Sequence, residues 1–301
     1  MREIESIGEP GAEHRAGAAS GDERGIGYAP SAATRTMVAL SEDAATRADA
    51  MVAEEVPVAF VYSGRPHVVM MCTPEHLDDL AVGFTLSEEI VARAADITAI
   101  EIERHSRGIE LRIQIPQPAL DALATRTRAL SGRTGCGLCG VEAIEDAVRT
   151  PHRVQSPLAI DASALWKAGE ALVDRQPLNR DTRAVHAAAW ATADGALLVV
   201  REDVGRHNAL DKVLGALVRE RVDASTGFLV VTSRASFELV QKATTMGVPL
   251  LAAVSRPTGL AVRLATEAGL TLVGLLRGKS GNVYSHPQRI RASTVLLPRL
   301  D

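Results

Sequence analysis

The second half of the chain alternates helical patterns with short apolar runs, and this alternation restricts the fold more than any other feature. Helices and strands are predicted in turn over residues 206–220, 227–232, 235–246, 249–254, 258–268 and 270–276. Such a βαβαβ pattern builds a largely parallel sheet with helices on its faces. A predicted hairpin over 185–192 and 196–201 adds antiparallel strands at one edge. We therefore expect a three-layer α/β domain with a mostly parallel mixed sheet.

The first half has a different pattern. Two hairpins are predicted, over residues 56–72 and 98–115, and helices follow them over 74–93 and 119–130. This arrangement is typical of an α+β domain. We expect the chain to divide into a disordered tail, an α+β domain that ends in a cysteine-containing loop, and the α/β domain, over residues 1–35, 36–155 and 156–301.

Composition excludes several classes of protein. The formal net charge is −4 and aromatic residues make up 3% of the 301 residues, which argues against nucleic-acid binding. No run approaches 18 apolar residues and no signal-peptide pattern opens the chain, so a membrane-spanning or secreted protein is not expected. Three cysteines are too few for a disulfide scaffold. We expect a cytoplasmic protein with reduced thiols.

Two of the cysteines, Cys136 and Cys139, lie three residues apart in the glycine-rich segment 131–140. Structural zinc requires four ligands, and the sequence has no second C-x-x-C or H-x-x-x-H motif. A zinc deaminase would need H-x-E and P-C-x-x-C motifs, and neither is present. These absences predict no zinc and favour thiol chemistry on a flexible loop.

The neighbours of the cysteine pair favour the thiolate form. Arg126, Arg128 and Arg133 precede the pair, and no acidic residue lies between 126 and 141. A short helix is predicted from Val141, and its N-terminus is directed toward the pair. A thiolate can accept a sulfur atom and pass it on as a persulfide. An exposed pair without a role, or half of a zinc site shared between subunits, is the alternative.

Hydroxyl groups and arginines follow two of the predicted parallel strands, and a similar group follows the third. Because the carboxyl ends of parallel strands lie side by side, these groups are expected to face one ligand-binding crevice. Guanidinium groups there can bind phosphates, although most of the 29 arginines are explained as well by codon usage. The residues concerned are Ser233, Arg234, Ser255, Arg256, Arg277 and Ser280.

The motif R-E-D-V-G-R-H-N-A-L-D-K over residues 201–212 places a glycine turn directly before a predicted helix. Arg206 and His207 therefore occupy the first turn of that helix, where free backbone N–H groups favour anions. A structural role for His207 is an equally good interpretation of the motif.

Six segments in this order resemble the formate dehydrogenase accessory sulfurtransferase family, FdhD. The resemblance extends over roughly residues 36–291. The matching segments are EEVPVAFVYSGRPHVVMM (54–71), GRTGCGLCGVE (132–142), HAAAW (186–190), EDVGRHNALDK (202–212), SRASFELVQKA (233–243) and LVGLLRGKSGNVYSHPQRI (272–290).

The resemblance implies a cytosolic sulfur carrier and a homodimer. Such a carrier accepts sulfur from a cysteine desulfurase as a cysteine persulfide. It passes the sulfur to the molybdenum or tungsten bis-guanine-dinucleotide cofactor, which is then inserted into the catalytic subunit of formate dehydrogenase. The family's persulfide cysteine matches Cys136, and Cys139 matches a supporting cysteine.

The resemblance also implies a cofactor site and a fold for the second domain. The family's cofactor-binding stretch matches Leu275, Leu276, Arg277, Gly278, Lys279 and Ser280, where the familiar Lys-Pro-Gly-Arg is replaced by Arg277-Gly278-Lys279. The second domain of the family is similar to cytidine deaminases in fold, without their zinc signature. A non-catalytic chaperone for the cofactor and a dithiol redox enzyme are the alternative functions.

Overall fold

The computed structural model describes residues 25–130 and 148–291. The predicted cysteine loop, the short helix after it and the first 24 residues therefore lie outside the described residues. Residues 25–35 are part of the described structure, although the sequence predicts a disordered tail there. Within the described ranges, none of the helices combines the length and the apolar character that crossing a membrane requires.

The first half of the chain forms two antiparallel hairpins that join into one four-stranded sheet, in the order β4-β3-β6-β5. Both predicted hairpins are confirmed, and β3 and β6 pair in parallel between them. Helices α1 and α2 follow the two hairpins. The elements are β3 (Val56–Tyr62), β4 (Arg65–Cys72), α1 (Leu77–Ser87), β5 (Ala99–His105), β6 (Gly108–Gln114) and α2 (Gln117–Leu130).

Helix α1 is shorter than the predicted helix over residues 74–93. It begins after His76 and ends at Ser87, and Glu89 then adopts a φ of 55°. Such a left-handed conformation interrupts a right-handed helix. Ile90 and Val91 nevertheless remain buried in the core of this half. The apolar pattern of the segment therefore indicates buried residues that follow the helix as well as those within it.

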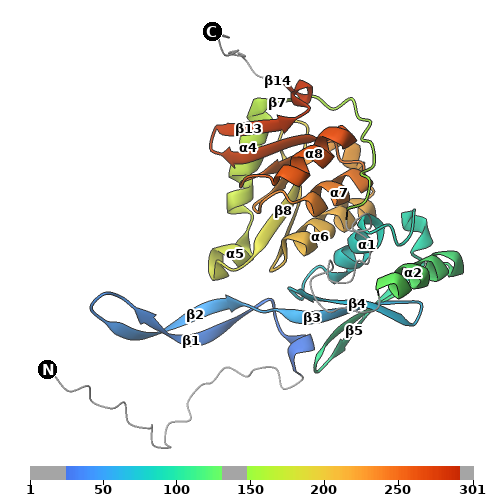
Figure 1. The fold of residues 1–301 in the computed structure, drawn as a ribbon. Helices are drawn as coiled ribbons and strands as arrows, with labels where there is room; N and C mark the ends of the chain where they lie inside the picture. Colours follow the sequence, from blue (N-terminus) through green and yellow to red (C-terminus); the bar gives the residue numbers. More distant parts are fainter. Residues whose placement is uncertain (1–24, 131–147, 292–301) are drawn as a thin grey trace, which may run out of the picture.

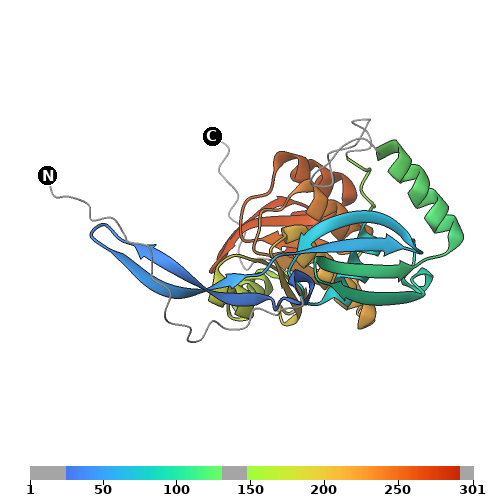
Figure 2. The ribbon, with the colours of Figure 1, turned by 90° about the horizontal axis from the view of Figure 1, so that it is seen from below.

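A separate two-stranded arm precedes this sheet and projects from the rest of the molecule (Figures 1 and 2). It consists of β1 (Ala32–Leu40) and β2 (Ala45–Ala53), which pair antiparallel along nine residues each. Helix α5 (Pro177–Thr182) contacts β2 near the body of the molecule. The start of β1 lies in the predicted tail, and the sequence predicts no strands over these residues, because neither strand has a buried face.

The second half forms a six-stranded sheet in the order β13-β12-β11-β10-β8-β9. The predicted hairpin and the three predicted strand–helix units are all present. The elements are α4 (Ala162–Asp174), β8 (His186–Thr192), β9 (Leu197–Asp203), α6 (Arg206–Arg219), β10 (Gly227–Val231), α7 (Phe237–Thr245), β11 (Leu250–Ala253), α8 (Gly259–Ala268), β12 (Thr271–Arg277) and β13 (Ser280–Ser285).

This sheet is less parallel than the sequence predicts. Only the pairs β10–β11 and β11–β12 are parallel within it. The pairs β10–β8, β8–β9 and β12–β13 are antiparallel. Three parallel strands therefore lie between β13 on one side and the β8–β9 hairpin on the other, and both neighbours pair with them in the antiparallel direction. The protein has a mixed α/β fold with several sheets.

Helices cover both faces of the six-stranded sheet, as Figure 1 shows. Leu229 and Val231 of β10 pack in a core with α6, α7 and α8. Phe228 and Val230 alternate with them and pack in a second core with α4. This alternation is the two-residue period of a strand whose two faces are both buried. A separate, short parallel pairing joins β7 (Ile160–Asp161) to β14 (Ile290–Arg291).

The two halves meet where α1 crosses α6. A Cβ atom added to Gly83 of α1 would lie 1.8 Å from the backbone oxygen of Asp211 in α6. A Cβ atom added to Gly215 of α6 would lie 1.9 Å from the backbone oxygen of Asp79 in α1. The two helix backbones are therefore in direct contact, and both glycines are required for this approach.

We expect Gly83→Ala to lower the free energy of unfolding by about 1–3 kcal/mol or more, because the two backbones must separate. Gly259→Ala is the matched control, since its nearest neighbour is the Arg263 Nη1 atom at 3.7 Å. Urea unfolding of both variants measures the difference. Equal stabilities of the two variants would show that α1 and α6 are not in close contact.

Candidate functional site

The carboxyl ends of β10, β11 and β12 lie side by side, as the sequence predicts. Leu251 lies opposite both Leu229 and Leu272 in the register of the three parallel strands. Hydrogen bonds continue this order beyond the strands, since the Leu275 N–H donates to the Ser255 carbonyl at 3.1 Å. We call this surface the carboxyl edge; it comprises residues 232–236, 254–258 and 275–280.

The first turn of α6 joins the carboxyl edge through the antiparallel strands. Val231 lies opposite Ala188 of β8, and His186 at the start of β8 lies opposite Asp203 at the end of β9. Helix α6 begins three residues later, at Arg206. The segment around Arg206, which is far away in the sequence from residues 275–280, is thus placed at the same edge of the sheet.

The predicted residues at the ends of β10 and β11 are not equally accessible. Arg234 and Arg256 are exposed. Ser233 is buried, and its hydroxyl donates to the Arg234 carbonyl at 3.0 Å. Ser255 is partly buried. The exposed guanidinium groups are therefore the side chains that an anion in solution can reach.

The predicted stretch from Leu275 to Ser280 forms the end of β12 and a tight turn into β13. Arg277 pairs with Ser280 across the turn, and Gly278 between them has a φ of 52°. Arg277, Gly278, Lys279 and Ser280 are all exposed. The turn therefore presents two cationic side chains to solvent, although it follows a strand and precedes another strand rather than a helix.

Leu275 and Leu276 differ from the rest of this stretch. The register of β12 shifts between Gly274 and Arg277, and Leu275 has a φ of 55°. A left-handed branched residue in a bulge is a strained conformation of the kind found at functional sites. Leu276 is 3% exposed and belongs to the core beside α4, so its side chain packs the interior.

Arg206 and His207 lie beside Glu238 of α7 and beside Ser236, the N-cap residue of that helix. His207 Nε2 lies 3.0 Å from Glu238 Oε2, and the Ser236 hydroxyl donates to the same oxygen at 2.8 Å. Arg206 Nη2 lies 3.9 Å from that oxygen. The hydrogen bond with His207 holds the pKa of Glu238 at about 2. The sequence signal for Glu238 is its place in the matched segment 233–243.

The remaining polar residues of the 201–212 motif are directed into the protein. Lys212 Nζ lies 2.6 Å from Asp203 Oδ2 and donates to the Thr73 carbonyl at 3.0 Å. The Lys212 and Asp203 side chains are both 0% exposed. The Asn208 amide donates to Asp203 Oδ1 and to the Met71 carbonyl, both at 2.9 Å. These residues join α6 to the end of β4 and are structural. Arg206 and His207 of the same motif instead lie in the first turn of α6 at the carboxyl edge.

A second buried ion pair continues this network toward α7. Lys242 Nζ lies 2.9 Å from Asp211 Oδ2, and the Ser87 hydroxyl donates to Asp211 Oδ1 at 2.7 Å. Lys242 also pairs with Glu88 at 2.7 Å. The network therefore connects α1, α6 and α7.

Cys72 is the cysteine that the structure describes, and it is fully buried. Burial raises the pKa of its thiol, and the Asn208 amide lies 3.3 Å from its sulfur. Cys72 therefore belongs to the core of the first half. Cys136 and Cys139 lie outside the described residues, so their roles stay predictions.

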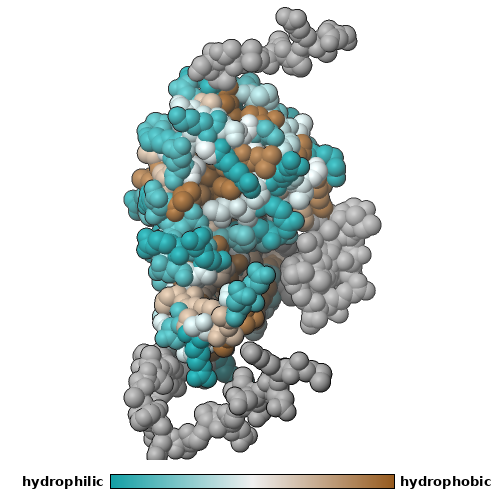
Figure 3. Space-filling model, turned by 90° about the vertical axis from the view of Figure 1, so that its left-hand side faces the viewer, coloured by the Kyte–Doolittle hydropathy of each residue, from teal (hydrophilic) through white to brown (hydrophobic). Residues whose placement is uncertain are grey.

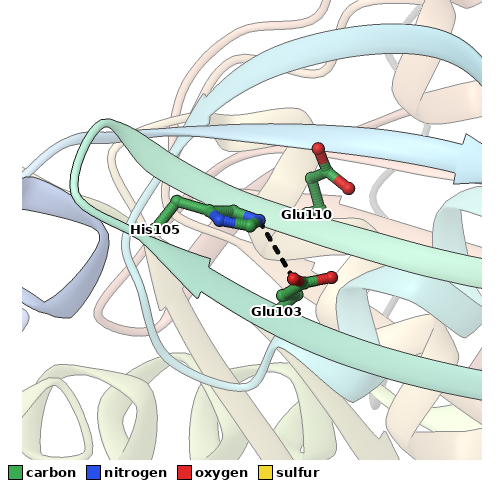
Figure 4. A group of neighbouring side chains, drawn as sticks. All are labelled: Glu103, His105 and Glu110. Atoms are coloured by element: carbon green, nitrogen blue, oxygen red, sulfur yellow. Dashed lines mark ion pairs between the residues drawn. The ribbon is translucent and has the colours of Figure 1, made fainter.

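One cluster in the first half has side chains that can bind metals. Glu103 and His105 of β5 and Glu110 of β6 bring their ligand atoms within 4.8 Å of one another (Figure 4). Arg112 already pairs with both carboxylates, at 2.7 Å from Glu103 and 3.1 Å from Glu110. The Arg112 guanidinium offsets the negative charge that would attract a cation, so we assign no metal site to this cluster.

The fold and the carboxyl edge define a mixed α/β protein with cationic and hydroxyl side chains gathered at one end of its main sheet. The family model FdhD/NarQ matches residues 53–291. The chain therefore belongs to the FdhD/NarQ family, as the sequence resemblance predicts.

Relatives from two genera agree with this assignment. The chain is 57% identical over 240 residues to a protein of Xanthomonas axonopodis named "Sulfur carrier protein FdhD", which covers 80% of this chain and 85% of the relative. A protein of Cupriavidus necator with the same name is 51% identical, over 80% of this chain and 83% of the relative. A crystal structure of a formate dehydrogenase accessory protein from Desulfotalea psychrophila has the same fold. Its TM-score is 0.69 at 24% identity, over 87% of this chain and 100% of that one.

We expect Lys212→Met to lower the free energy of unfolding by about 3–5 kcal/mol, because the Asp203 carboxylate stays buried without its cation. Lys167→Met removes an exposed ion pair with Asp194 and should cost no more than about 1 kcal/mol. Urea unfolding at pH 7 compares the two variants. A loss at Lys212 as small as that at Lys167 would contradict the central role of the buried pair.

Proposed function

We propose that this protein is a sulfur carrier for the maturation of formate dehydrogenase. It accepts sulfur from a cysteine desulfurase as a persulfide on Cys136 and transfers it to a molybdenum or tungsten bis-guanine-dinucleotide cofactor. The observation that carries this proposal is the identity of 51–57%, over 80% of the chain, with relatives named sulfur carriers. The cytoplasm, where thiols stay reduced, is the proposed location.

The loading step follows the chemistry of thiol–disulfide exchange. The thiolate of Cys136 attacks the outer sulfur of the persulfide on the desulfurase. A sulfur–sulfur bond forms on Cys136, the sulfur–sulfur bond of the desulfurase breaks, and the desulfurase cysteine leaves as a thiolate. No external oxidant or reductant is needed. Cys139 has a supporting role, and the nearby arginines of the sequence favour the thiolate.

The carboxyl edge is the proposed site for the guanine nucleotides of the cofactor. Exposed Arg234, Arg256, Arg277 and Lys279 provide cationic groups there, and the first turn of α6 provides backbone N–H groups. The further members of the proposed site are Arg206, His207, Ser233, Ser255, Leu275, Leu276, Gly278 and Ser280. A cytidine deaminase-like architecture for this half remains part of the proposal.

The same edge also supports a second candidate function. Its cations can hold the cofactor without any thiol, so a non-catalytic chaperone that delivers the cofactor to formate dehydrogenase is the alternative. The two candidates differ in their dependence on Cys136.

We expect the purified protein to gain a mass of about 32 Da, one sulfur atom, after incubation with a cysteine desulfurase and cysteine. Cys136→Ala should lose this adduct and leave formate dehydrogenase inactive in cells, whereas Cys72→Ala, the control, should retain the adduct. Intact-protein mass spectrometry and an assay of formate oxidation measure the two effects. Active formate dehydrogenase with Cys136→Ala would instead support the chaperone.

We also propose that the protein is a homodimer, in which each arm packs on the other protomer. The arm exposes Met37, Val38, Leu40, Met51 and Val52. In Figure 3 the arm points toward the viewer from the lower part of the molecule, where pale brown and teal side chains mix. An isolated two-stranded hairpin is only marginally stable in water, so a regular arm of this length favours a partner.

The size of the arm is sufficient for a dimer. Nine residues at about 3.4 Å each give a face of roughly 30 by 10 Å. Two such faces, each packed on an equal area of the other protomer, bury about 1,200 Å², which is the lower end of the range for stable interfaces.

We expect Met37→Glu to convert the dimer into a monomer at micromolar concentration, because a charge would be buried in the contact. Val173→Glu is the control, since Val173 is 70% exposed on α4, outside the arm. Light scattering coupled to gel filtration gives the mass of each. A wild-type protein that elutes as a monomer would exclude this interface.

A further inference from the structure

The outer face of the four-stranded sheet is apolar along β3 and β4. The inward side chains of β3, such as Val58 and Phe60, are buried in the core with α1 and α2. Because side chains alternate between the two faces of a strand, the residues between them point outward. In Figure 2 this outer face is turned toward the viewer, and no α-helix of the described chain lies in front of it. The outward residues, which we call the apolar strip, are Pro57, Ala59 and Val61 of β3 and Pro66, Val69 and Met71 of β4.

The apolar strip is exposed and has a polar border. Val69 is 63% exposed and Met71 is 45% exposed. On the neighbouring strands β5 and β6, the outward Glu103, Glu110 and Arg112 form ion pairs with one another. Eight residues of β4 at about 3.4 Å each give the strip a size of roughly 27 by 10 Å. An exposed apolar patch with a polar rim is typical of a surface that binds another protein.

The open edge of β4 is less suited to a partner than the face. β4 is an outer strand of the order β4-β3-β6-β5, so one of its sides borders no other strand of this sheet. Pro66 has no N–H group to donate, and the register with β3 shifts between Phe60 and Val61. Both features interrupt the regular backbone pattern that an added strand requires. We therefore expect a partner on the face of β3 and β4.

The arm and the β3–β4 hairpin extend in opposite directions from one point. Glu54 and Glu55 are the residues that separate β2 from β3. Figures 1 and 2 show the tip of the arm on one side of this point and the turn between β3 and β4 on the other. A two-fold axis at this point, perpendicular to the arm, places the arm of each protomer along the β3–β4 hairpin of the other. The arm is roughly 30 Å long, which matches the length of the apolar strip.

The charges at the two ends agree with this arrangement. The turn at the tip of the arm carries Glu42 and Asp43, and both are exposed. The turn between β3 and β4 ends at Arg65, which is also exposed. The two-fold arrangement brings the tip of one arm to the β3–β4 turn of the other protomer, so that opposite charges meet there.

Exposed apolar side chains lie on both faces of the arm. Met37 and Val52 point to one face, and Val38 and Leu40 point to the other, because alternate residues of a strand share a face. The arm therefore has apolar surface left for a partner even where α5 contacts β2.

We infer that the apolar strip receives the arm of a second copy of this chain, with the tip of the arm beside Arg65. The inference rests on the homodimer proposed above, and it adds the receiving surface and the direction in which the arm lies on it. The arm then covers Val69 and Met71, and removal of their apolar surface from water stabilises the contact. The charges at the tip contribute less to affinity and fix the direction of the arm instead.

Photo-crosslinking of the full chain tests where the tip of the arm lies. Ala39 and Leu40 are replaced, one at a time, by p-benzoyl-L-phenylalanine, because these two positions point to opposite faces of the arm. An equal mixture of isotopically light and heavy protein identifies crosslinks between copies by mass spectrometry. We expect one or both probes to crosslink to residues 63–69 of the other copy. The same probe at Val173, which is 70% exposed on α4, is the control and should give no crosslink to this segment.

The affinity of the dimer tests the apolar contact. Val69→Glu should raise the dissociation constant of the dimer at least tenfold, because a carboxylate would be buried under the arm. The exposure of Val69 makes a glutamate compatible with the folded protomer, which circular dichroism checks. Val283→Glu is the matched control, since Val283 is 41% exposed on β13, and it should dimerise as wild type does. Sedimentation velocity over a series of concentrations measures the dissociation constants.

A charge exchange tests the direction of the arm. Arg65→Glu and Glu42→Arg should each raise the dissociation constant about two- to fivefold, as expected for an exposed ion pair. The variant that combines them should dimerise more tightly than either one, because the opposite charges meet again. A combined effect equal to the product of the two single effects would overturn the placement of the tip beside Arg65.

The remaining outcomes separate this inference from the proposals on which it rests. Crosslinks between copies that all lie outside β3 and β4, or a wild-type dissociation constant for Val69→Glu, would overturn the receiving surface and leave a dimer in place. A wild-type protein that sediments as a monomer would exclude the dimer itself. The persulfide experiment on Cys136 is independent of these results.

Discussion

The buried ion pair between Asp203 and Lys212 is the interaction on which the rest of the structure depends. Both side chains are completely buried, so their charges lose the solvation of water. The cost is offset only when every remaining hydrogen-bonding group is satisfied. The Thr73 backbone and the Asn208 amide provide those contacts, which fixes the end of β4, the end of β9 and the first turns of α6 relative to one another.

This constraint determines where the functional surface lies. Helix α6 must begin directly after β9, and β9 pairs with β8, which pairs with β10 in the main sheet. Arg206 and His207 are therefore carried to the carboxyl edge by residues of the same motif that face inward. The direct contact of Gly83 and Gly215 holds α1 on the other side of this helix. The side chains of this motif that are directed inward hold the two halves of the protein together. Those that are directed outward are accessible to a ligand.

Much of this arrangement could be predicted from periodicity. The two hairpins of the first half, the strand–helix alternation of the second half and the side-by-side strand ends follow from local patterns, because buried faces repeat every two or 3.6 residues. The arm over residues 32–53 could not be predicted this way, because neither of its strands has a buried face. The antiparallel pairing of β13 with β12 could not be predicted either, because β13 is mostly exposed and has no regular buried face.

The sequence by itself determined the family of this protein, the cysteine pair and the set of cationic residues at the strand ends, since residue type and order carry that information. Only the tertiary structure decided which members of one motif are structural and which face solvent. Lys212 and Arg206 lie six positions apart on one helix. The Lys212 side chain is completely buried in an ion pair, whereas the Arg206 side chain is one-third exposed. Glu238 acquires its place beside His207 in the same way, because packing of α6 against α7 brings together residues 31 positions apart.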